Sequence, residues 1–218
     1  MSELDEFISK NYSWFVETWR NYPWVIQRAD SARYFLMHQY GGFYLDLDIT
    51  CKKSFDAILE EVAPEIDTIV SDAPEIGVDT PMVFSKPGTP FMELTQQRLM
   101  SMNIWYILPY FTIYMSTGPY MLSASYWHFP CKETIHVLPM ELSRKKYFRH
   151  GQSGTWHTWD TEIIETFLRF YETGWLVVVL LIIVVYWFVV ALLISAVCCR
   201  KFYKILSKGI KRIIYTRL

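Results

Sequence analysis

The stretch Gly41-Gly42-Phe43-Tyr44-Leu45-Asp46-Leu47-Asp48 carries two acidic residues one position apart in an apolar segment. Successive side chains of a β-strand point to opposite faces. This alternation predicts an apolar face and an acidic face: Phe43, Leu45, Leu47 and Ile49 on the first, and Tyr44, Asp46 and Asp48 on the second. Two partly dehydrated carboxylates need a compensating cation. Mn²⁺ or Mg²⁺ bound to a diphosphate meets that need, because both ions take carboxylate and phosphate oxygens.

An Asp-x-Asp triplet alone is a weak signal, because it also occurs as two solvated acids at the end of a strand. The residues before it strengthen the signal. The spacing of apolar residues predicts a helix over Gln27–Tyr40, with its apolar side at Ala29, Ala32, Leu36, Met37 and Tyr40. Gly41 then suits the left-handed residue that ends a helix. Asp30 and Arg33 are three residues apart, so they share a face of this helix.

These residues carry a family resemblance. The segments 27–35 and 40–48 resemble the signature of Asp-x-Asp sugar transferases with a GT-A fold (glycosyltransferase family 32). More closely, they are similar to fungal-type mannosyltransferases that make mannosyl-inositol-phosphoryl-ceramide. The likeness continues through Ser85-Lys86-Pro87-Gly88, Ser116-Thr117-Gly118-Pro119 and the segment 150–157, so it covers about residues 10–160.

The resemblance implies a role for each matching residue. Asp48 would bind Mn²⁺ (or Mg²⁺), while Asp46 would contact the ribose and, often through water, the metal. Asp30 would hold donor-sugar hydroxyls and Arg33 would neutralise diphosphate charge, with Tyr44 beside them in the donor site. We therefore expect Asp46, Asp48 and Arg33 to be the catalytic residues.

Two histidines are further candidates for the metal site. The histidine of the Trp156-His157 pair is a metal ligand by resemblance, or a buried histidine bonded to a carbonyl. His150 is a weaker candidate. The remaining three are interpreted as structural or surface residues: His38, His128 and His136.

The resemblance also predicts an α/β fold, a GT-A-like (Rossmann-like) domain over residues 1–172. Relatives begin with a strand and loop that open the nucleotide-binding half of the sheet. This chain starts at Met1-Ser2-Glu3, where Ser2 can cap a helix running through Ile8. We therefore expect the first parallel strand to be missing, and we favour a truncated chain over one that has lost activity.

A long apolar segment follows this domain. Residues 174–199 contain no charged residue, and a bilayer core of about 30 Å needs about 20 apolar residues as a helix. We predict a transmembrane helix there and a basic tail over 200–218. The tail holds seven Lys and Arg residues, and every Asp and Glu precedes it. Because Lys and Arg favour the cytosolic side, the domain is predicted to be lumenal, and the tail to contact anionic lipids rather than nucleic acid.

Other segments are less informative. Short helices are predicted over 54–61 and 90–100, and strands over 68–70 and 82–84. The charge-free segment 102–120 has two interpretations, core packing or a membrane-facing surface that admits a lipid acceptor. Cys51 and Cys131 could form a disulfide or stay unpaired, and their spacing does not decide.

The resulting hypothesis is a Golgi-type membrane enzyme with a lumenal catalytic domain. By resemblance, it would transfer mannose from GDP-mannose to inositol-phosphoryl-ceramide with retention of configuration, beside a polytopic regulatory subunit. One alternative is transfer of a hexose to glycoprotein glycans. Another is a non-catalytic, membrane-bound remnant that binds a partner subunit.

Overall fold

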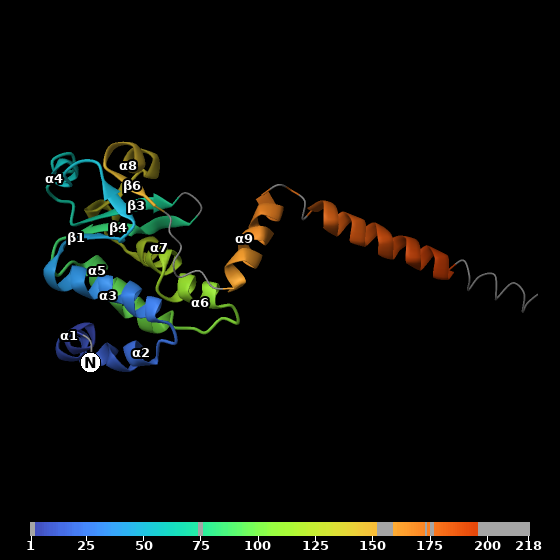
Figure 1. Ribbon diagram of the computed structural model, residues 1–218, viewed down its shortest axis with the longest axis horizontal. Helices are drawn as coiled ribbons and strands as arrows, with labels where there is room; N and C mark the ends of the chain where they lie inside the picture. The colour runs from blue at the N-terminus through green and yellow to red at the C-terminus, as the bar shows by residue number, and fades with distance from the viewer. Residues whose placement is uncertain (1–2, 74–75, 152–158, 173, 175–176, 196–218) are drawn as a thin grey trace, which may run out of the picture. The chain divides into compact units, whose positions relative to one another are not determined.

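The computed structural model describes residues 3–73, 76–151, 159–172, 174 and 177–195. The chain divides into two compact units, residues 1–160 and 161–218. The first unit combines sheets with surrounding helices (Figure 1), so the predicted α/β class is confirmed. The second unit holds most of α9 (Trp159–Glu172) and the helix Val177–Ser195.

The central sheet has four strands in the order β1-β4-β3-β5. Their bounds are β1 Gly42–Leu45, β3 Thr68–Ala73, β4 Gly77–Ser85 and β5 Ile135–Leu138. β4 pairs antiparallel with both β1 and β3, and β5 pairs parallel with β3. The predicted strands over 68–70 and 82–84 are confirmed inside β3 and β4. A separate antiparallel pair joins β2 (Ile49–Cys51) to β6 (Phe148–His150).

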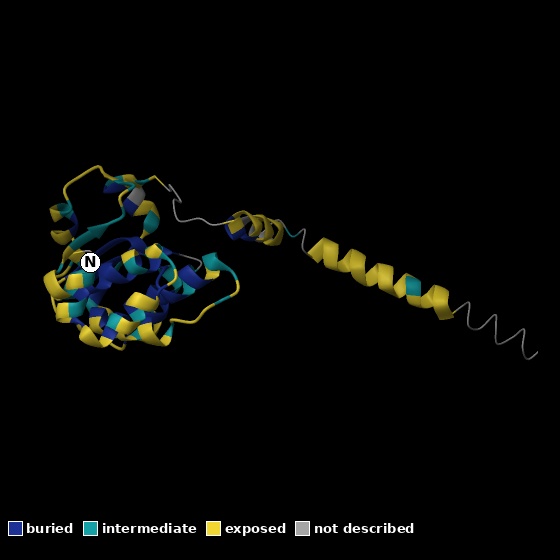
Figure 2. Cartoon of the chain, turned by 60° about the horizontal axis from the view of Figure 1, so that its bottom comes forward, coloured by how far each residue is buried: buried dark blue, intermediate teal, exposed yellow. Residues whose placement is uncertain are grey.

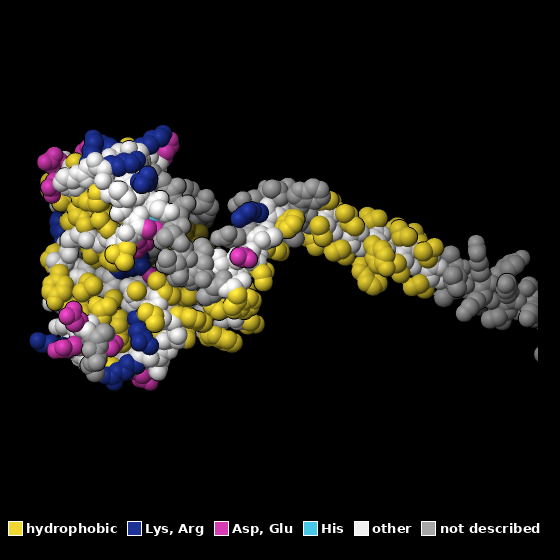
Figure 3. All heavy atoms as spheres, viewed as in Figure 1, with side chains coloured by type: hydrophobic (Ala, Val, Ile, Leu, Met, Phe, Trp, Pro, Cys, Tyr) yellow, Lys and Arg dark blue, Asp and Glu magenta, His cyan; other side chains and the backbone are white. Residues whose placement is uncertain are grey.

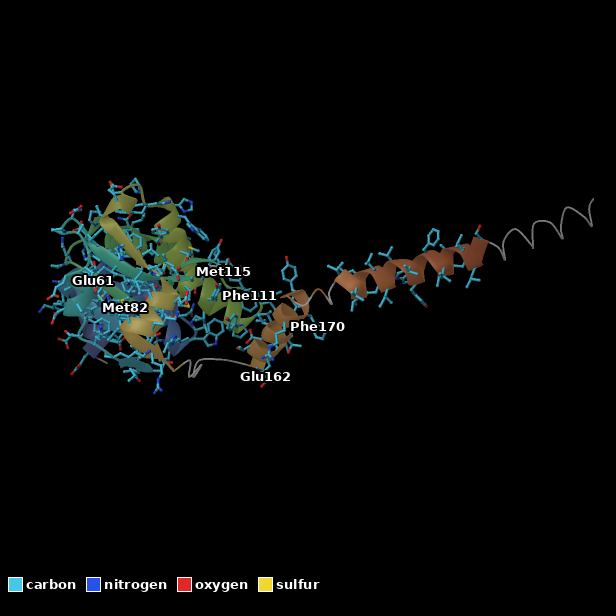
Figure 4. All side chains as sticks on the ribbon, turned by 90° about the horizontal axis from the view of Figure 1, so that it is seen from above. Glu61, Met82, Phe111, Met115, Glu162 and Phe170 are labelled. Atoms are coloured by element: carbon cyan, nitrogen blue, oxygen red, sulfur yellow. The ribbon has the colours of Figure 1, made fainter. Side chains whose placement is uncertain are left out.

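The helices of the first unit divide between two apolar cores, one on each face of the central sheet. The larger core draws on α1 (Glu3–Asn11), α2 (Val16–Asn21), α3 (Val25–Tyr40), α5 (Pro90–Ser101) and α7 (Pro119–His128). The smaller core lies beneath α4 (Asp56–Leu59) and the hairpin-like β2–β6 pair, and it includes Met82 and Phe148. Met82 is labelled within the body of the unit in Figure 4. The segment Met140–Lys146 forms α8.

Strand β1 contributes to both cores as the alternation predicted. Phe43 and Leu45 pack against the smaller core, and Tyr44 packs against the larger one. The strand enters from α3 through two glycines with positive φ, Gly41 at 68° and Gly42 at 94°. A Cβ on Gly41 would lie 2.8 Å from Cδ of Pro87, so this position requires glycine for space as well as for conformation.

The predicted helix over 27–40 is confirmed within α3, but its predicted apolar side is wrong in part. Ala32 and Met37 are buried, whereas Ala29 and Tyr40 are exposed. The buried side of the helix also carries polar residues: Gln27, Asp30, Ser31 and Arg33. Hydrophobic spacing fails here because buried polar side chains with hydrogen-bond partners take the place of apolar ones.

The other predicted helices lie close to their predicted bounds. The helix predicted over 90–100 is α5, and the one predicted over 54–61 is the shorter α4. The helix predicted through Ile8 is α1, and Ile8 is fully buried. Ser2, its predicted cap, lies outside the described residues. Cys51 and Cys131 are free and exposed.

The charge-free segment 102–120 has a buried part and an exposed part. Thr112 and Ile113 of α6 (Pro109–Ser116) are buried, which fits core packing. Ile104, Trp105 and Ile107, just before α6, are exposed by 53%, 69% and 82%.

The helix Val177–Ser195 is long and apolar enough to cross a membrane, by length and composition, and none of it is buried. Figure 2 shows it exposed along its length. It falls inside the segment 174–199 that the sequence predicted to span a membrane. The predicted basic tail over 200–218 lies outside the described residues.

Candidate active site

The two acids of the Asp-x-Asp triplet lie in a turn that follows β1. The amide of Asp46 donates to the carbonyl of Pro81 (2.9 Å), and the amide of Ile49 donates to the carbonyl of Asp46 (3.0 Å). Leu47 is fully exposed at the tip of this turn. The prediction that Leu47 continues the apolar face of Phe43 and Leu45 is therefore wrong, because the strand ends at Leu45 and Leu47 lies in the turn.

The strand pair β2–β6 brings a histidine to the second acid. Ile49 is paired with His150, and the amide of Gly151 donates to the carbonyl of Asp48 (2.9 Å). Nε2 of His150 lies 3.3 Å from Oδ1 of Asp48. A Cβ on Gly151 would lie 3.2 Å from the Asp48 carbonyl oxygen, so a glycine here allows the two backbones to approach.

Three side chains thus converge in a way that could hold a metal ion. Asp46, Asp48 and His150 each offer one ligand atom, and these atoms lie within 4.8 Å of one another. Their side chains are 29%, 21% and 20% exposed. Two carboxylates with one imidazole form a donor set that suits Mn²⁺, and the partial exposure leaves room for ligands from a bound substrate. The residues present therefore fit the predicted ion.

A buried ion pair lies behind the triplet. Arg33 pairs with Asp30 one turn away on α3, and their side chains are only 5% and 10% exposed. Nη1 of Arg33 also donates to the carbonyl of Thr80 (3.0 Å) and lies 3.6 Å from Oδ1 of Asp46. The arginine therefore joins α3, β4 and the triplet through a single charged group.

Tyr44 and Thr117 complete this arrangement. The guanidinium of Arg33 lies 4.6 Å above the ring centre of Tyr44, and the Tyr44 hydroxyl donates to Oδ1 of Asp46 (3.1 Å). On the other side, the hydroxyl of Thr117 donates to Oδ2 of Asp30 (3.2 Å). Each carboxylate therefore accepts a hydroxyl hydrogen bond in addition to its contact with Arg33.

Burial sets the electrostatics of the pair. It raises the pKa of Asp30 to about 6, although the charge of Arg33 and the hydrogen bond from Thr117 act to lower it. Burial acts to lower the pKa of Arg33, but its electrostatic interactions with Asp30, Tyr34, Tyr44 and Asp46 together outweigh burial, and the pKa is raised. Burial, reinforced by Asp46, raises the pKa of Tyr44 to about 12. At neutral pH the site therefore holds a fixed cation beside a carboxylate.

The structure adds residues that the sequence did not single out. Thr80 and Pro81 of β4 bind Arg33 and Asp46 through their carbonyls. The preceding residue, Asp79, is half-buried, and burial raises its pKa against the opposing charges of His150 and Arg33. Backbone carbonyls leave no sequence signal. Thr117, by contrast, lies in the Ser116-Thr117-Gly118-Pro119 block. The resemblance to the family includes this block but assigns Thr117 no role.

The structure places one of the two candidate histidines of the metal site. His150, the weaker candidate, lies beside Asp48, whereas His157 lies outside the described residues. His38 and His128 bond to Tyr12 and to the carbonyl of Ala124, in keeping with their structural interpretation. The pairing of β2 with β6 could not be predicted because β6 has only three residues.

Comparisons with known proteins point to one kind of enzyme. The family described as "glycosyltransferase sugar-binding region containing DXD motif" matches residues 1–64. Inositol phosphoceramide mannosyltransferase 1 of Schizosaccharomyces pombe is 33% identical over 170 residues, which cover 74% of this chain and 51% of that protein. Mannosyl phosphorylinositol ceramide synthase SUR1 of Saccharomyces cerevisiae is 31% identical over 168 residues, covering 73% of this chain and 43% of that protein.

A third relative, inositol phosphoceramide mannosyltransferase 2 of Schizosaccharomyces pombe, is 34% identical over 169 residues, covering 72% of this chain and 48% of that protein. The chain thus spans about half the length of the curated relatives it matches. The matched family segment, residues 1–64, contains the buried pair and both acids of the triplet. The resemblance stated from the sequence is confirmed: residues 1–64 match the DXD-containing glycosyltransferase family, and the chain is a homologue of proteins named inositol phosphoceramide mannosyltransferases.

Proposed function

We propose that this chain is the catalytic part of a membrane-anchored mannosyltransferase with a GT-A-like domain. It transfers mannose from GDP-mannose to inositol-phosphoryl-ceramide with retention of configuration. The names of its relatives support the sugar and the acceptor. The observation that carries the proposal is the convergence of Asp46, Asp48 and His150 beside a buried arginine.

We call the three partly exposed side chains of Asp46, Asp48 and His150 the half-exposed cluster. It is proposed to hold Mn²⁺ (or Mg²⁺). When bound, such an ion supplies positive charge that offsets the charge developing on a departing nucleoside diphosphate. His157, which lies outside the described residues, remains a candidate for a further ligand. Within this cluster, Nε2 of His150 lies 3.3 Å from the carboxylate of Asp48.

The buried pair is proposed to position the site and set its charge. Arg33 is only 4% exposed. Its charge therefore acts on a bound diphosphate mainly through the intervening protein and not by direct contact. It holds Asp46 directly and through the ring of Tyr44, whose hydroxyl bonds the same carboxylate oxygen. Asp30 keeps Arg33 in place and presents a small exposed edge to donor-sugar hydroxyls. Holding these groups in one geometry before substrate arrives lowers the entropic part of the barrier.

The helix Val177–Ser195 is proposed to anchor the enzyme in a Golgi membrane, with the catalytic unit lumenal and the basic tail cytosolic. The distribution of charge in the sequence supports this orientation, since every Asp and Glu precedes the tail. A polytopic regulatory subunit would bind within the same membrane.

The test is a substitution in the triplet with a matched surface control. Asp48→Asn in the full chain, reconstituted in vesicles that contain inositol-phosphoryl-ceramide, should lower Mn²⁺-dependent mannose transfer by a factor of about 100 or more, since a bound ion's ligand is lost. Asp67→Asn is the control, because Asp67 is a surface acid outside the triplet and pairs with Lys86. Both variants should keep the circular dichroism spectrum of the unchanged chain.

Three outcomes separate this proposal from its alternatives. Unchanged transfer by Asp48→Asn would overturn the metal-site mechanism. Transfer of a hexose to glycoprotein glycans, with none to the ceramide acceptor, would replace the proposed acceptor and keep the donor site. No transfer by the unchanged chain from any sugar nucleotide would favour a non-catalytic remnant.

A further inference from the structure

A group of exposed apolar side chains lies just before and within the first turn of α6. It consists of Ile104, Trp105, Ile107 and Phe111, which we call the apolar rim, and each is at least 40% exposed. The surrounding sequence is unusual because no Asp, Glu, Lys or Arg occurs from Leu99 to Cys131. Figure 3 shows hydrophobic side chains gathered at the edge of the first unit where α6 and the preceding segment lie. Clustered exposure of this kind marks an interaction surface.

The apolar rim lies where the chain leaves the first unit. The carboxylate of Asp160, the last residue of that unit, accepts a hydrogen bond from the amide of Tyr110 (2.8 Å) at the start of α6. From Asp160 the chain continues into α9 and then into the apolar helix Val177–Ser195. The rim and the route to the membrane helix therefore share one place on the unit.

The apolar rim is also connected to the candidate active site by a single short helix. Phe111 and Met115 of α6 lie at the edge of the unit in Figure 4. Thr117, directly after α6, bonds the Asp30 carboxylate that pairs with Arg33. Helix α6 has eight residues, so at about 1.5 Å per residue it spans about 12 Å. The polar layer of one bilayer leaflet is about 5–8 Å thick, so a helix of this length is long enough to reach across it.

We propose that the apolar rim inserts into the boundary between headgroups and acyl chains of the bilayer, so that the active site opens onto the headgroup layer. This inference rests on the proposed membrane anchoring. The chemistry of the rim favours lipid, because tryptophan is enriched at this boundary and exposed apolar side chains gain from burial in it. The rim then selects an acceptor that is presented at a membrane surface, whatever the donor sugar.

Tryptophan fluorescence tests the location of the rim without requiring catalysis. The full chain is reconstituted in phosphatidylcholine vesicles with no other protein, with or without lipids brominated near the headgroup end of the acyl chain. Subtracting the emission of Trp105→Leu from that of the unchanged chain isolates Trp105. The same subtraction with Trp14→Leu isolates an exposed tryptophan (46%) outside the rim.

The two tryptophans should behave in opposite ways. Brominated lipid should reduce the Trp105 emission about twofold or more while aqueous iodide has little effect, because the side chain lies among acyl chains. Iodide should quench the Trp14 emission, and brominated lipid should not. The inference is overturned if iodide quenches Trp105 and brominated lipid does not. That result would indicate a rim open to water or to a protein partner.

Activity measurements then separate this inference from the proposed function. Replacing Ile104, Trp105 and Ile107 with serine should lower transfer to acceptor in vesicles about tenfold, because serine does not hold the unit against lipid. Transfer to a water-soluble inositol-phosphate headgroup should stay within about twofold, since the rim is outside the catalytic machinery. Replacement of the same three residues with leucine should preserve both activities. An equal loss on both acceptors would overturn the inference, whereas no transfer by the unchanged chain would overturn only the proposed function.

Discussion

Two groups of charges lie side by side in this protein, and burial divides their roles. The Asp30–Arg33 pair is almost fully enclosed, whereas Asp46, Asp48 and His150 retain about a fifth to a third of their side-chain exposure. The opposite charges of Asp30 and Arg33 compensate each other within the protein. The half-exposed cluster has two acids and one histidine, so its charge is completed by what binds there. This contrast is the basis of our proposal that the buried pair holds the geometry and the partly exposed cluster takes the ligand.

The largest expected effect is loss of the buried cation. Arg33→Met leaves Asp30 without its ion-pair partner and Thr80 without a donor, and such a loss costs about 3–5 kcal/mol in the free energy of unfolding at pH 7. Urea denaturation followed by tryptophan fluorescence measures this value. The control Arg20→Met removes an exposed arginine of α2 and should change it by less than about 0.5 kcal/mol. Equal effects would mean that Arg33 is not a structural residue.

The pH dependence of Asp30 gives the next effect. Because burial raises its pKa to about 6, transfer should decline as the pH falls through about 6, where the ionised partner of Arg33 is lost. The free energy of unfolding should change in the opposite direction and increase as the pH falls. A raised folded-state pKa contributes stability that is fully present below the unfolded pKa near 3.9 and is lost as the pH rises through about 6.

The variant Asp30→Asn isolates both trends, because asparagine does not titrate. The difference in unfolding free energy between the unchanged chain and Asp30→Asn should vary between about pH 4 and 6 and stay constant above it. A difference that is flat across this range would show that Asp30 keeps an ordinary pKa.

Much of the buried pair could be predicted from the sequence, and the comparison shows why. Asp30 and Arg33 are three residues apart on one helix, so local geometry alone brings them together. The double glycine likewise predicted the exit from α3 into β1. The half-exposed cluster was harder, because His150 is about a hundred positions away from Asp48 and reaches it only through the β2–β6 pair. Family resemblance named His157, which lies outside the described residues. No local pattern marks the three-residue strand β6 that carries His150.

A smaller effect is expected for the hydroxyl that links the two groups. Tyr44→Phe keeps the ring under the guanidinium of Arg33 but removes the hydrogen bond to Asp46. The missing bond is worth about 1 kcal/mol, so half-saturation with Mn²⁺ should require about five to ten times more of the ion, as groups that orient ligands affect metal affinity by about tenfold or more. Titration of transfer activity with Mn²⁺ measures this change. An unchanged midpoint would mean that Arg33 alone orients Asp46.

The turn itself provides the smallest effect and the clearest distinction between the predicted and the observed backbone. A strand continuing through Asp48 would bury Leu47 on the same face as Leu45, whereas the observed turn leaves Leu47 fully exposed and packs Leu45 against the smaller core. Leu47→Ser should therefore change the free energy of unfolding by less than about 0.5 kcal/mol. Leu45→Ala should cost more, about 1 kcal/mol, because it removes partly buried methyl groups that pack against the smaller core. Equal costs at the two positions would support a strand that continues through Asp48. The proximity of the two acids would then result from strand alternation and not from a turn.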